Sequence, residues 1–359
     1  MKFLPILLRY LRIPLSVCIF AIFVAQNSYL GLGEISTIQS LVMLTLMPIT
    51  LAIEDDFLKL RLTANKVHPF LLFKKLLLNR VRSIQNLLIA FFVLVIGMHL
   101  ISAKIEVNIY LITLITLHNL LLIYSSIVYR DVQKYSLHAF VSSYSPIIML
   151  IFTIIVINFQ IKLLDAFAIG VGITTSILIF FQLFISAQYK NFWTYELDKS
   201  KNVITNRYQD KLAILFKKSR LQLSVMIAST ISLESAGQLK LLYQLYNALL
   251  IPRIQMNANL PSYLHNNMIQ ISRISKDSLI SFILIAVASV CLLVLMMFIR
   301  NFAILEEYYF DGILFSTGLI VVAAVAEHFD GINTRYLMLR GETRLVYAFV
   351  FSMICFGFV

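Results

Sequence analysis

The segment ILLRYLRIPLSVCIF, from Ile6 to Phe20, is followed about two hundred residues later by ILFKKSRLQLSVMIA, from Ile214 to Ala228. The two segments share seven identities in fifteen positions, and Arg12 aligns with Arg220. Internal repeats determine the architecture of a chain, so this match is the first feature to interpret. It predicts that one segment is present twice.

The likeness continues downstream of both segments. Gly33 precedes Pro48 by fifteen residues, and Gly237 precedes Pro252 by the same fifteen. Leucine-rich segments can match by chance, but the shared order of basic cluster, apolar run, glycine, apolar run and proline favours duplication. The chain is therefore expected to contain two similar halves.

Composition places the chain in a membrane. Hydrophobic residues make up 60% of it and charged residues 13%, with a mean hydropathy of +0.85, whereas about a quarter of a soluble domain is charged. A helix needs about 20 apolar residues to cross the roughly 30 Å hydrocarbon core of a bilayer. Such runs lie at 13–30, 35–54, 84–103, 107–128, 138–160, 163–187, 237–256, 278–299, 311–329 and 344–359, and the repeat adds a shorter one at 213–233.

These runs predict an all-α fold, a polytopic membrane bundle of about eleven transmembrane helices. Only helices and closed barrels satisfy their backbone in lipid, and the runs lack the alternation of barrel strands. A six-helix N-terminal lobe would occupy residues 1–187, a cytoplasmic linker 188–212 and an incomplete C-terminal lobe 213–359. The repeat offset leaves the run at 163–187 without a partner, as in a chain shortened at its C-terminus.

The net charge of +12 would suit a nucleic-acid binder, but the distribution of the charge indicates a membrane topology instead. If the spans alternate from an inside N-terminus, 26 of the 30 basic residues fall in inner segments. This bias predicts a multi-pass protein with a cytoplasmic N-terminus. Residues 55–83 are amphipathic and carry seven of these cations, so membrane lipids, and not nucleic acid, are the expected partners of this segment.

Polar side chains within or beside the spans are the candidate site residues, because an ionisable group rarely faces lipid. The set comprises Arg12, Gln26, Asn27, His118, Asn119, Gln182, Arg220, Gln244, Asn247 and Arg253. Hydrogen bonding between helices is the simpler interpretation of the uncharged members, and of Glu327 and His328, which end the run at 311–329. The arginines either snorkel to headgroups or form the basic mouth of a cavity for a phosphate-bearing substrate.

Two further groups are assigned structural roles. The acidic cluster at 54–56 stands at the inner end of a span and is expected to be a solvated helix cap. Three cysteines, Cys18, Cys291 and Cys355, lie in apolar runs without paired spacing, so they are expected to be buried packing residues without a disulfide or a metal. The sequence contains no nucleotide-binding loop of the GxxxxGK[ST] type, and no cofactor is expected.

The chain resembles the Wzx-type oligosaccharide flippases of the multidrug/oligosaccharidyl-lipid/polysaccharide exporter superfamily, which includes the MATE transporters. Two segments carry the resemblance: YLGLGEISTIQSLVMLTLMPITLAIED at 29–55 and ISLESAGQLKLLYQLYNALLIPRIQMNANLPSYL at 231–264. It implies two six-helix lobes around a cavity that passes undecaprenyl-pyrophosphate-linked oligosaccharide across the bacterial inner membrane. A polysaccharide polymerase and a chain-length regulator are implied as further partners. The chain departs from this family at its short seventh span and its absent twelfth span.

The resemblance also implies roles for individual residues. Arg12, Arg220 and Arg253 would attract the pyrophosphate group, and the polar cavity residues would pass the sugar hydroxyls. Flipping breaks no covalent bond, so no residue is catalytic and the protein is not expected to be an enzyme. The two lobes would rock to open the cavity to each side in turn.

Three alternatives remain open. A MATE-type drug or cation antiporter would need a buried carboxylate, and outside the helix ends the sequence offers none. A membrane glycosyltransferase or polymerase commonly needs a sizeable outer loop with catalytic residues, and the outer turns here are short. An inactive, truncated flippase would also account for the shortened second lobe.

Overall fold

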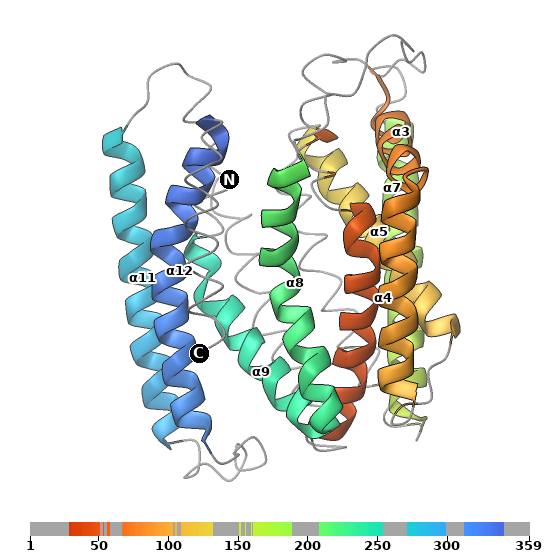
Figure 1. The fold of residues 1–359 in the computed structure, drawn as a ribbon. Coiled ribbons are helices and arrows are strands. Elements are labelled where there is room, and N and C mark those ends of the chain that lie inside the picture. The colour runs from red at the N-terminus through yellow and green to blue at the C-terminus, as the bar shows by residue number, and fades with distance from the viewer. Residues whose placement is uncertain are drawn as a thin grey trace. The chain divides into compact units, whose positions relative to one another are not determined.

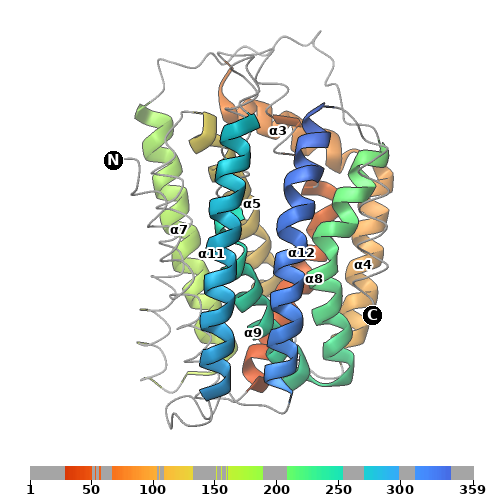
Figure 2. The ribbon, with the colours of Figure 1, turned by 90° about the vertical axis from the view of Figure 1, so that its left-hand side faces the viewer.

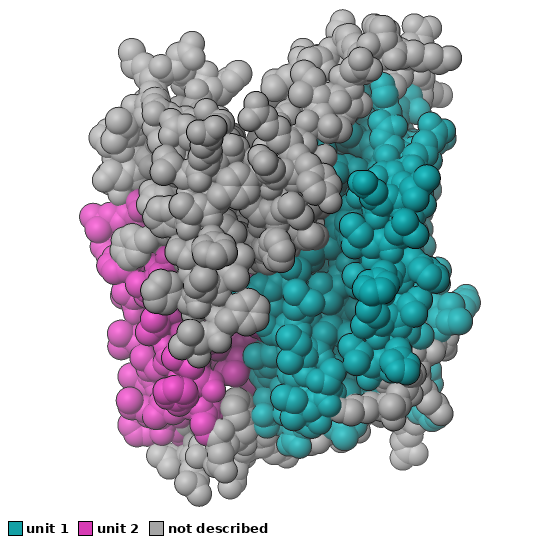
Figure 3. Space-filling model, in the orientation of Figure 1, with its two compact units in different colours: residues 1–239 teal, residues 240–359 magenta. Residues whose placement is uncertain are grey.

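The computed structural model describes residues 29–50, 53, 56, 57, 67–102, 105, 109–131, 151, 155, 159, 161–188, 208–253, 271–298 and 312–340. These residues are overwhelmingly helical and none of them forms a strand, which confirms the all-α class for this part of the chain. The chain divides into two compact units, residues 1–239 and residues 240–359 (Figure 3).

Apart from α3, each described helix overlaps one of the predicted spans. Unit 1 contains the helix Tyr29–Thr50, α3 (Pro69–Val81), α4 (Ile84–Ser102), α5 (Ile109–Asp131), α7 (Leu163–Gln188) and α8 (Tyr208–Ile231). The next helix, α9 (Leu233–Leu249), begins in unit 1 and continues into unit 2, which also contains α11 (Ile271–Phe298) and α12 (Ile313–Arg340) (Figure 1). Nearly all of the predicted spans at 13–30 and 138–160, the whole of the span at 344–359, and most of the predicted linker lie outside the described residues.

Several of these helices can cross a membrane. Three stretches within the described residues are long and apolar enough by themselves: Tyr29–Thr50, Leu163–Ala187 and Ser278–Phe298. The bent pair of α3 and α4 raises this number to four if it is one span, so the described helices support a membrane protein, with fewer spans than the predicted eleven. The short predicted span at 213–233 lies in α8, which has 24 residues and is therefore about 36 Å long. The cations of α8, which include Lys217, Lys218 and Arg220, make it too polar to be counted among the helices that can cross a membrane by themselves.

Helix Tyr29–Thr50 forms the centre of unit 1. Its apolar window is 72% buried, compared with 22% for the window in α11. Its buried side chains, among them Ile38 and Leu41, pack in one cluster with Ile115 of α5, Val171 of α7 and Met226 of α8. Leu94 and Met98 of α4 and Leu233 of α9 also pack against this cluster, whereas α11 exposes most of its apolar surface.

The exposed apolar surface is concentrated on α4 and α11. Phe91 and Phe92 of α4 are each 66% exposed, and a row on α11 that includes Ile283, Val287 and Val290 is about half exposed or more. Contiguous apolar faces of this kind are rare on soluble monomers and suit contact with lipid. Cys291 also lies on the exposed side of α11, so its predicted role as a buried packing residue is wrong.

The bend between α3 and α4 is sharp, at 74°. His68 caps the start of α3 by accepting a hydrogen bond from the amide of Phe70, and Pro69 occupies the first turn, where its missing N–H costs nothing. Leu72 and Leu76 face inward and pack in one cluster with residues that include Ile53. As a result α3 lies across one end of unit 1, while α4, α7 and α8 run along it (Figure 2).

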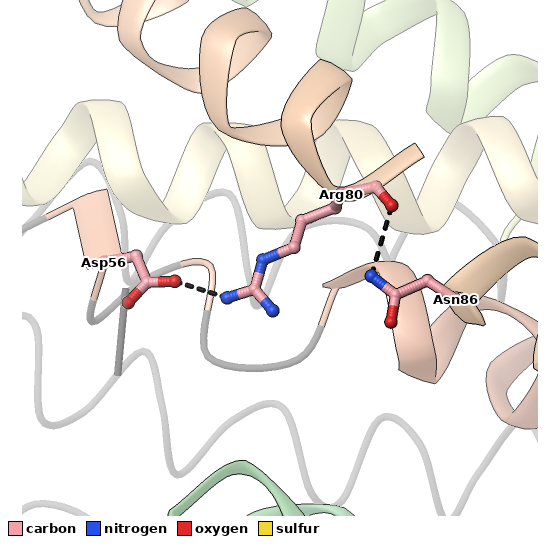
Figure 4. Close-up of polar contacts among 3 residues, drawn as sticks. All are labelled: Asp56, Arg80 and Asn86. Carbon is pink, nitrogen blue, oxygen red and sulfur yellow. Dashed lines mark hydrogen bonds and ion pairs between the residues drawn. The ribbon is translucent and has the colours of Figure 1, made fainter. Parts of the chain in front are cut away.

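A buried ion pair fixes α3 to the chain segment that follows the helix Tyr29–Thr50. The Asp56 carboxylate is fully buried and accepts a hydrogen bond from the Arg80 guanidinium, and the Asn86 amide at the start of α4 donates to the Arg80 carbonyl (Figure 4). The prediction of a solvated acidic cap is therefore wrong for Asp56. Its partner is a cation 24 residues further on, which inspection of the helix end alone does not reveal.

Candidate functional site

The two glycines that mark the internal repeat lie against one another. A Cβ added to Gly33 would overlap the carbonyl oxygen of Leu233, and a Cβ added to Gly237 would overlap the carbonyl oxygen of Tyr29. Both contacts lie within unit 1, where the start of helix Tyr29–Thr50 crosses the start of α9. The two backbones touch directly, which only residues without a side chain allow.

The two contacts are equivalent under the repeat. Residue 233 is 204 positions after residue 29, and residue 237 is 204 positions after residue 33. Gly33 contacts Leu233, which is the repeat counterpart of Tyr29. Tyr29 in turn contacts Gly237, which is the repeat counterpart of Gly33. Such reciprocity is the property of an interface on a two-fold axis. The crossing relates the two repeat segments by a local two-fold, as two copies of one ancestral helix would be related.

Small side chains continue the close approach along the helix Tyr29–Thr50. Ser36, Thr37 and Ser40 are all buried, and the Ser36 hydroxyl donates to the Gly33 carbonyl oxygen at 3.0 Å. At the start of α9, Ser232 accepts a hydrogen bond from the amide of Ser235 and caps the helix. Side-chain hydrogen bonds thus stabilise the starts of both helices where they cross.

Two of the predicted site residues meet in a polar seam between α5 and α7. His118 Nδ1 lies 3.1 Å from Thr175 Oγ1, and the Gln182 side-chain amide donates to the Ser125 hydroxyl. Each pair is 57 residues apart in sequence, so the two helices run parallel with a constant register. The seam has two rungs seven residues apart, or about 10 Å along the helix axis.

A third hydrogen bond lies at the α3 end of this seam. His68, which caps α3, has its Nε2 atom 3.2 Å from the Ser186 hydroxyl of α7. The simpler interpretation of His118 and Gln182, hydrogen bonding between helices, is therefore confirmed. The neighbouring Asn119 is half-buried on α5. The seam holds α5 and α7 in register and is built from uncharged side chains and histidines.

Unit 2 contains a nearly buried pair of opposite charges. Arg253, in the helical turn 251–253 after α9, has its Nη1 atom 2.7 Å from Oε1 of Glu327 in α12. The two side chains are only 8% and 12% exposed. A buried pair of this kind must offset a large desolvation penalty. It places an arginine predicted for the site in direct contact with a carboxylate.

The polar group extends from this pair to α11. His328 is fully buried, its Nδ1 atom lies 3.5 Å from the Ser281 hydroxyl, and its ring packs beside Phe282. Glu327 does not end its helix as predicted, because α12 continues to Arg340. Glu327 was thus missed as a site residue, although a charge in an apolar run was the signal that could have found it.

The remaining predicted residues occupy varied positions. Arg220 on α8 and Gln244 on α9 are half-buried, whereas Asn247 on α9 is exposed. Arg12, Gln26 and Asn27 lie outside the described residues. Among the residues that the structure describes, no three His, Cys, Asp or Glu side chains gather into a metal-binding group.

Comparison with protein-family models, with curated proteins and with solved structures finds no match to this chain. The arguments for its function therefore come from its own residues. Three features carry them: the reciprocal glycine crossing, the neutral seam between α5 and α7, and the pair of Arg253 and Glu327.

Proposed function

We propose that the protein is a flippase that moves undecaprenyl-pyrophosphate-linked oligosaccharide from the inner to the outer leaflet of the bacterial inner membrane, for assembly of surface polysaccharide. The observation that carries the proposal is the reciprocal contact of Gly33 and Gly237. Carriers that alternate between two open states are commonly built from two copies of one helical unit. A crossing of equivalent helices is what such a duplicated carrier requires, whereas an enzyme has no such need.

Arg253 is the residue that recognises the substrate in this proposal. Its guanidinium suits a pyrophosphate, because the planar fork of donors matches phosphate oxygens. In the structure that guanidinium forms an ion pair with the Glu327 carboxylate. The pyrophosphate would displace the carboxylate, so that Glu327 compensates the buried cation whenever no substrate is bound. Binding is then an exchange of one anion for another, and no bond is broken.

A MATE-type cation antiporter is the second candidate, and Glu327 is the observation that favours it. This side chain is the buried carboxylate that such a transporter needs, and Asp56 is another. Each of them contacts an arginine, so a bound cation would first have to displace a guanidinium. An anionic substrate avoids this conflict because it brings its charge to Arg253 instead.

Complementation of a flippase-deficient bacterial strain tests the proposal. The wild-type chain should restore surface glycan, and Arg253→Gln should lose that activity while its membrane level is unchanged. Lys162→Gln is the matched control, because Lys162 is an exposed cation at the start of α7. A wild-type chain that is abundant in the membrane but restores no glycan would overturn the flippase. Proton-driven efflux of a cationic dye by the same chain would favour the antiporter.

The glycine crossing allows a second test. Gly33→Ala and Gly237→Ala should each impair complementation to a similar degree, because both methyl groups meet a backbone carbonyl on the partner helix. Gly318→Ala is the control, since a Cβ there meets nothing within 4 Å. Full activity of both crossing variants would remove the crossing as support for a carrier.

A further inference from the structure

The exposed side of α3 carries a regular alternation of apolar and basic residues. Phe70, Lys74, Leu78 and Arg82 follow one another at intervals of four residues and are all exposed. Phe70 is 49% exposed and makes a T-shaped contact with Tyr124 of α5 on its other side, while Leu78 is 40% exposed. Side chains four apart lie on the same side of a helix, so these four form one stripe, called here the α3 stripe.

The opposite side of α3 is already used by the protein. Leu72, Phe73 and Leu76 are buried in a cluster with Phe57 and with Ile127 of α5. An ordinary interfacial helix inserts its apolar side into lipid. In α3 that side forms part of the protein core instead. The α3 stripe is consequently the surface of this helix that remains for a partner outside the protein.

The bend to α4 gives the direction in which α3 runs. α4 exposes large apolar side chains, among them Phe91 and Phe92, as a lipid-crossing helix does. The angle of 74° between the two helices therefore leaves α3 close to the plane of the membrane. With this orientation all four residues of the stripe lie at about the same level along the membrane normal.

The charge of the α3 stripe is positive along its whole length. The segment 69–102 contains no Asp or Glu. Asp56 precedes α3 in the chain, and its carboxylate is buried against Arg80 on the inner side of the helix. Lys74 and Arg82 thus present their cations outward, each next to an exposed apolar side chain.

We propose that the α3 stripe binds the headgroups of anionic phospholipids in the bilayer. Lys74 and Arg82 contact the phosphates, while Phe70 and Leu78 enter the upper acyl region between them. Apolar and basic side chains alternate along the stripe about every helical turn, and a bilayer offers both acyl chains and phosphates to them. A soluble anion would bind only the two cations. The stripe lies on the outer surface of a helix and not in a pocket, so it suits a surface of many lipids. This inference is independent of the proposed flippase activity.

Nanodiscs that contain the full chain provide the test. Thermal unfolding is followed in discs of phosphatidylcholine alone and in discs that also contain a fixed fraction of phosphatidylglycerol. Phosphatidylglycerol should raise the Tm of the wild-type chain, and high salt should reduce the rise because it screens exposed charges. The double variant Lys74→Gln/Arg82→Gln should lose more than half of the rise and keep its Tm in phosphatidylcholine, because both side chains are exposed.

Lys162→Gln is the matched control, since this cation precedes α7 and the Ser186 contact with His68 places the other end of α7 beside α3. The control should keep the whole phosphatidylglycerol effect. Full retention of the effect by Lys74→Gln/Arg82→Gln, or an equal loss in Lys162→Gln, would refute the α3 stripe. A Tm rise of the same size with inorganic phosphate would also refute it, because the site would then be one for a free anion.

Discussion

Two buried ion pairs, Asp56 with Arg80 in unit 1 and Arg253 with Glu327 in unit 2, have the same chemistry in different settings. The first joins α3 to the core of unit 1, and a hydrogen bond from Asn86 to the Arg80 carbonyl adds to it. The second includes Glu327, which lies fourteen residues into α12, or about 21 Å along the helix. An apolar pair would serve packing there at least as well. The first pair therefore anchors α3, whereas the proposed function gives the second pair the exchange with substrate.

The largest expected effect is at the anchoring pair. Asp56→Ala leaves the Arg80 guanidinium buried without its carboxylate, which should lower the free energy of unfolding by about 3–5 kcal/mol. Denaturant titration in mixed micelles measures this loss. Arg82→Ala at the C-cap of α3 is the control, because the side chain is exposed and should change stability by less than about 0.5 kcal/mol.

An apolar replacement of both partners distinguishes anchoring from a need for charge. The double variant Asp56→Leu/Arg80→Met should recover most of the stability lost in Asp56→Ala, because it removes the desolvation penalty along with the pair. If the double variant instead stays as unstable as the single one, the charges themselves are required, and the contrast between the two pairs disappears.

The sequence predicted the positions of helices well, because the length of an apolar run is a local property. The run at 163–187 corresponds to α7 at Leu163–Gln188. The internal repeat in the sequence also identified Gly33 and Gly237 as equivalent residues. That the two glycines touch one another depends on how the helices pack, which a pattern along the chain does not contain.

The burial of charged residues was not predictable in the same way. Residues 54–56 have the pattern of a solvated helix end, and only the return of the chain through α3 brings Arg80 to Asp56. The same arginine was counted among the headgroup cations of 55–83. Arg253 was identified as a site residue by its place at a span end, but its partner Glu327 comes 74 residues later. Pairing across such distances is tertiary information.

An intermediate effect is expected at the second pair. Glu327→Gln should lower the free energy of unfolding by about 1–3 kcal/mol, because the Arg253 guanidinium keeps a polar but uncharged neighbour. The same variant should bind undecaprenyl phosphate more tightly than the wild type does, since no carboxylate competes for the arginine. Fluorescence titration in nanodiscs, with uncharged undecaprenol as the comparison ligand, measures the binding.

Glu234→Gln is the control for that experiment, because Glu234 is an exposed carboxylate at the start of α9. The double variant Arg253→Gln/Glu327→Gln should regain stability and yet fail to bind the phosphate. Weaker binding by Glu327→Gln would mean that the second pair is an anchor like the first, and the proposed exchange would then be wrong.

The smallest effect on stability is expected in the seam between α5 and α7, because its contacts are hydrogen bonds between uncharged groups and not ion pairs. Ser125→Ala and Gln182→Leu remove the two sides of one hydrogen bond, and such bonds in membrane bundles average about 0.6 kcal/mol of coupling. A double-mutant cycle on the free energy of unfolding measures that coupling, and Thr113→Ala is the control because this exposed hydroxyl donates to the Ile109 carbonyl of its own helix. A coupling as large as the loss at Asp56 would show that neutral and charged pairs hold these helices equally, and charge would then have no special part in the division between anchor and site.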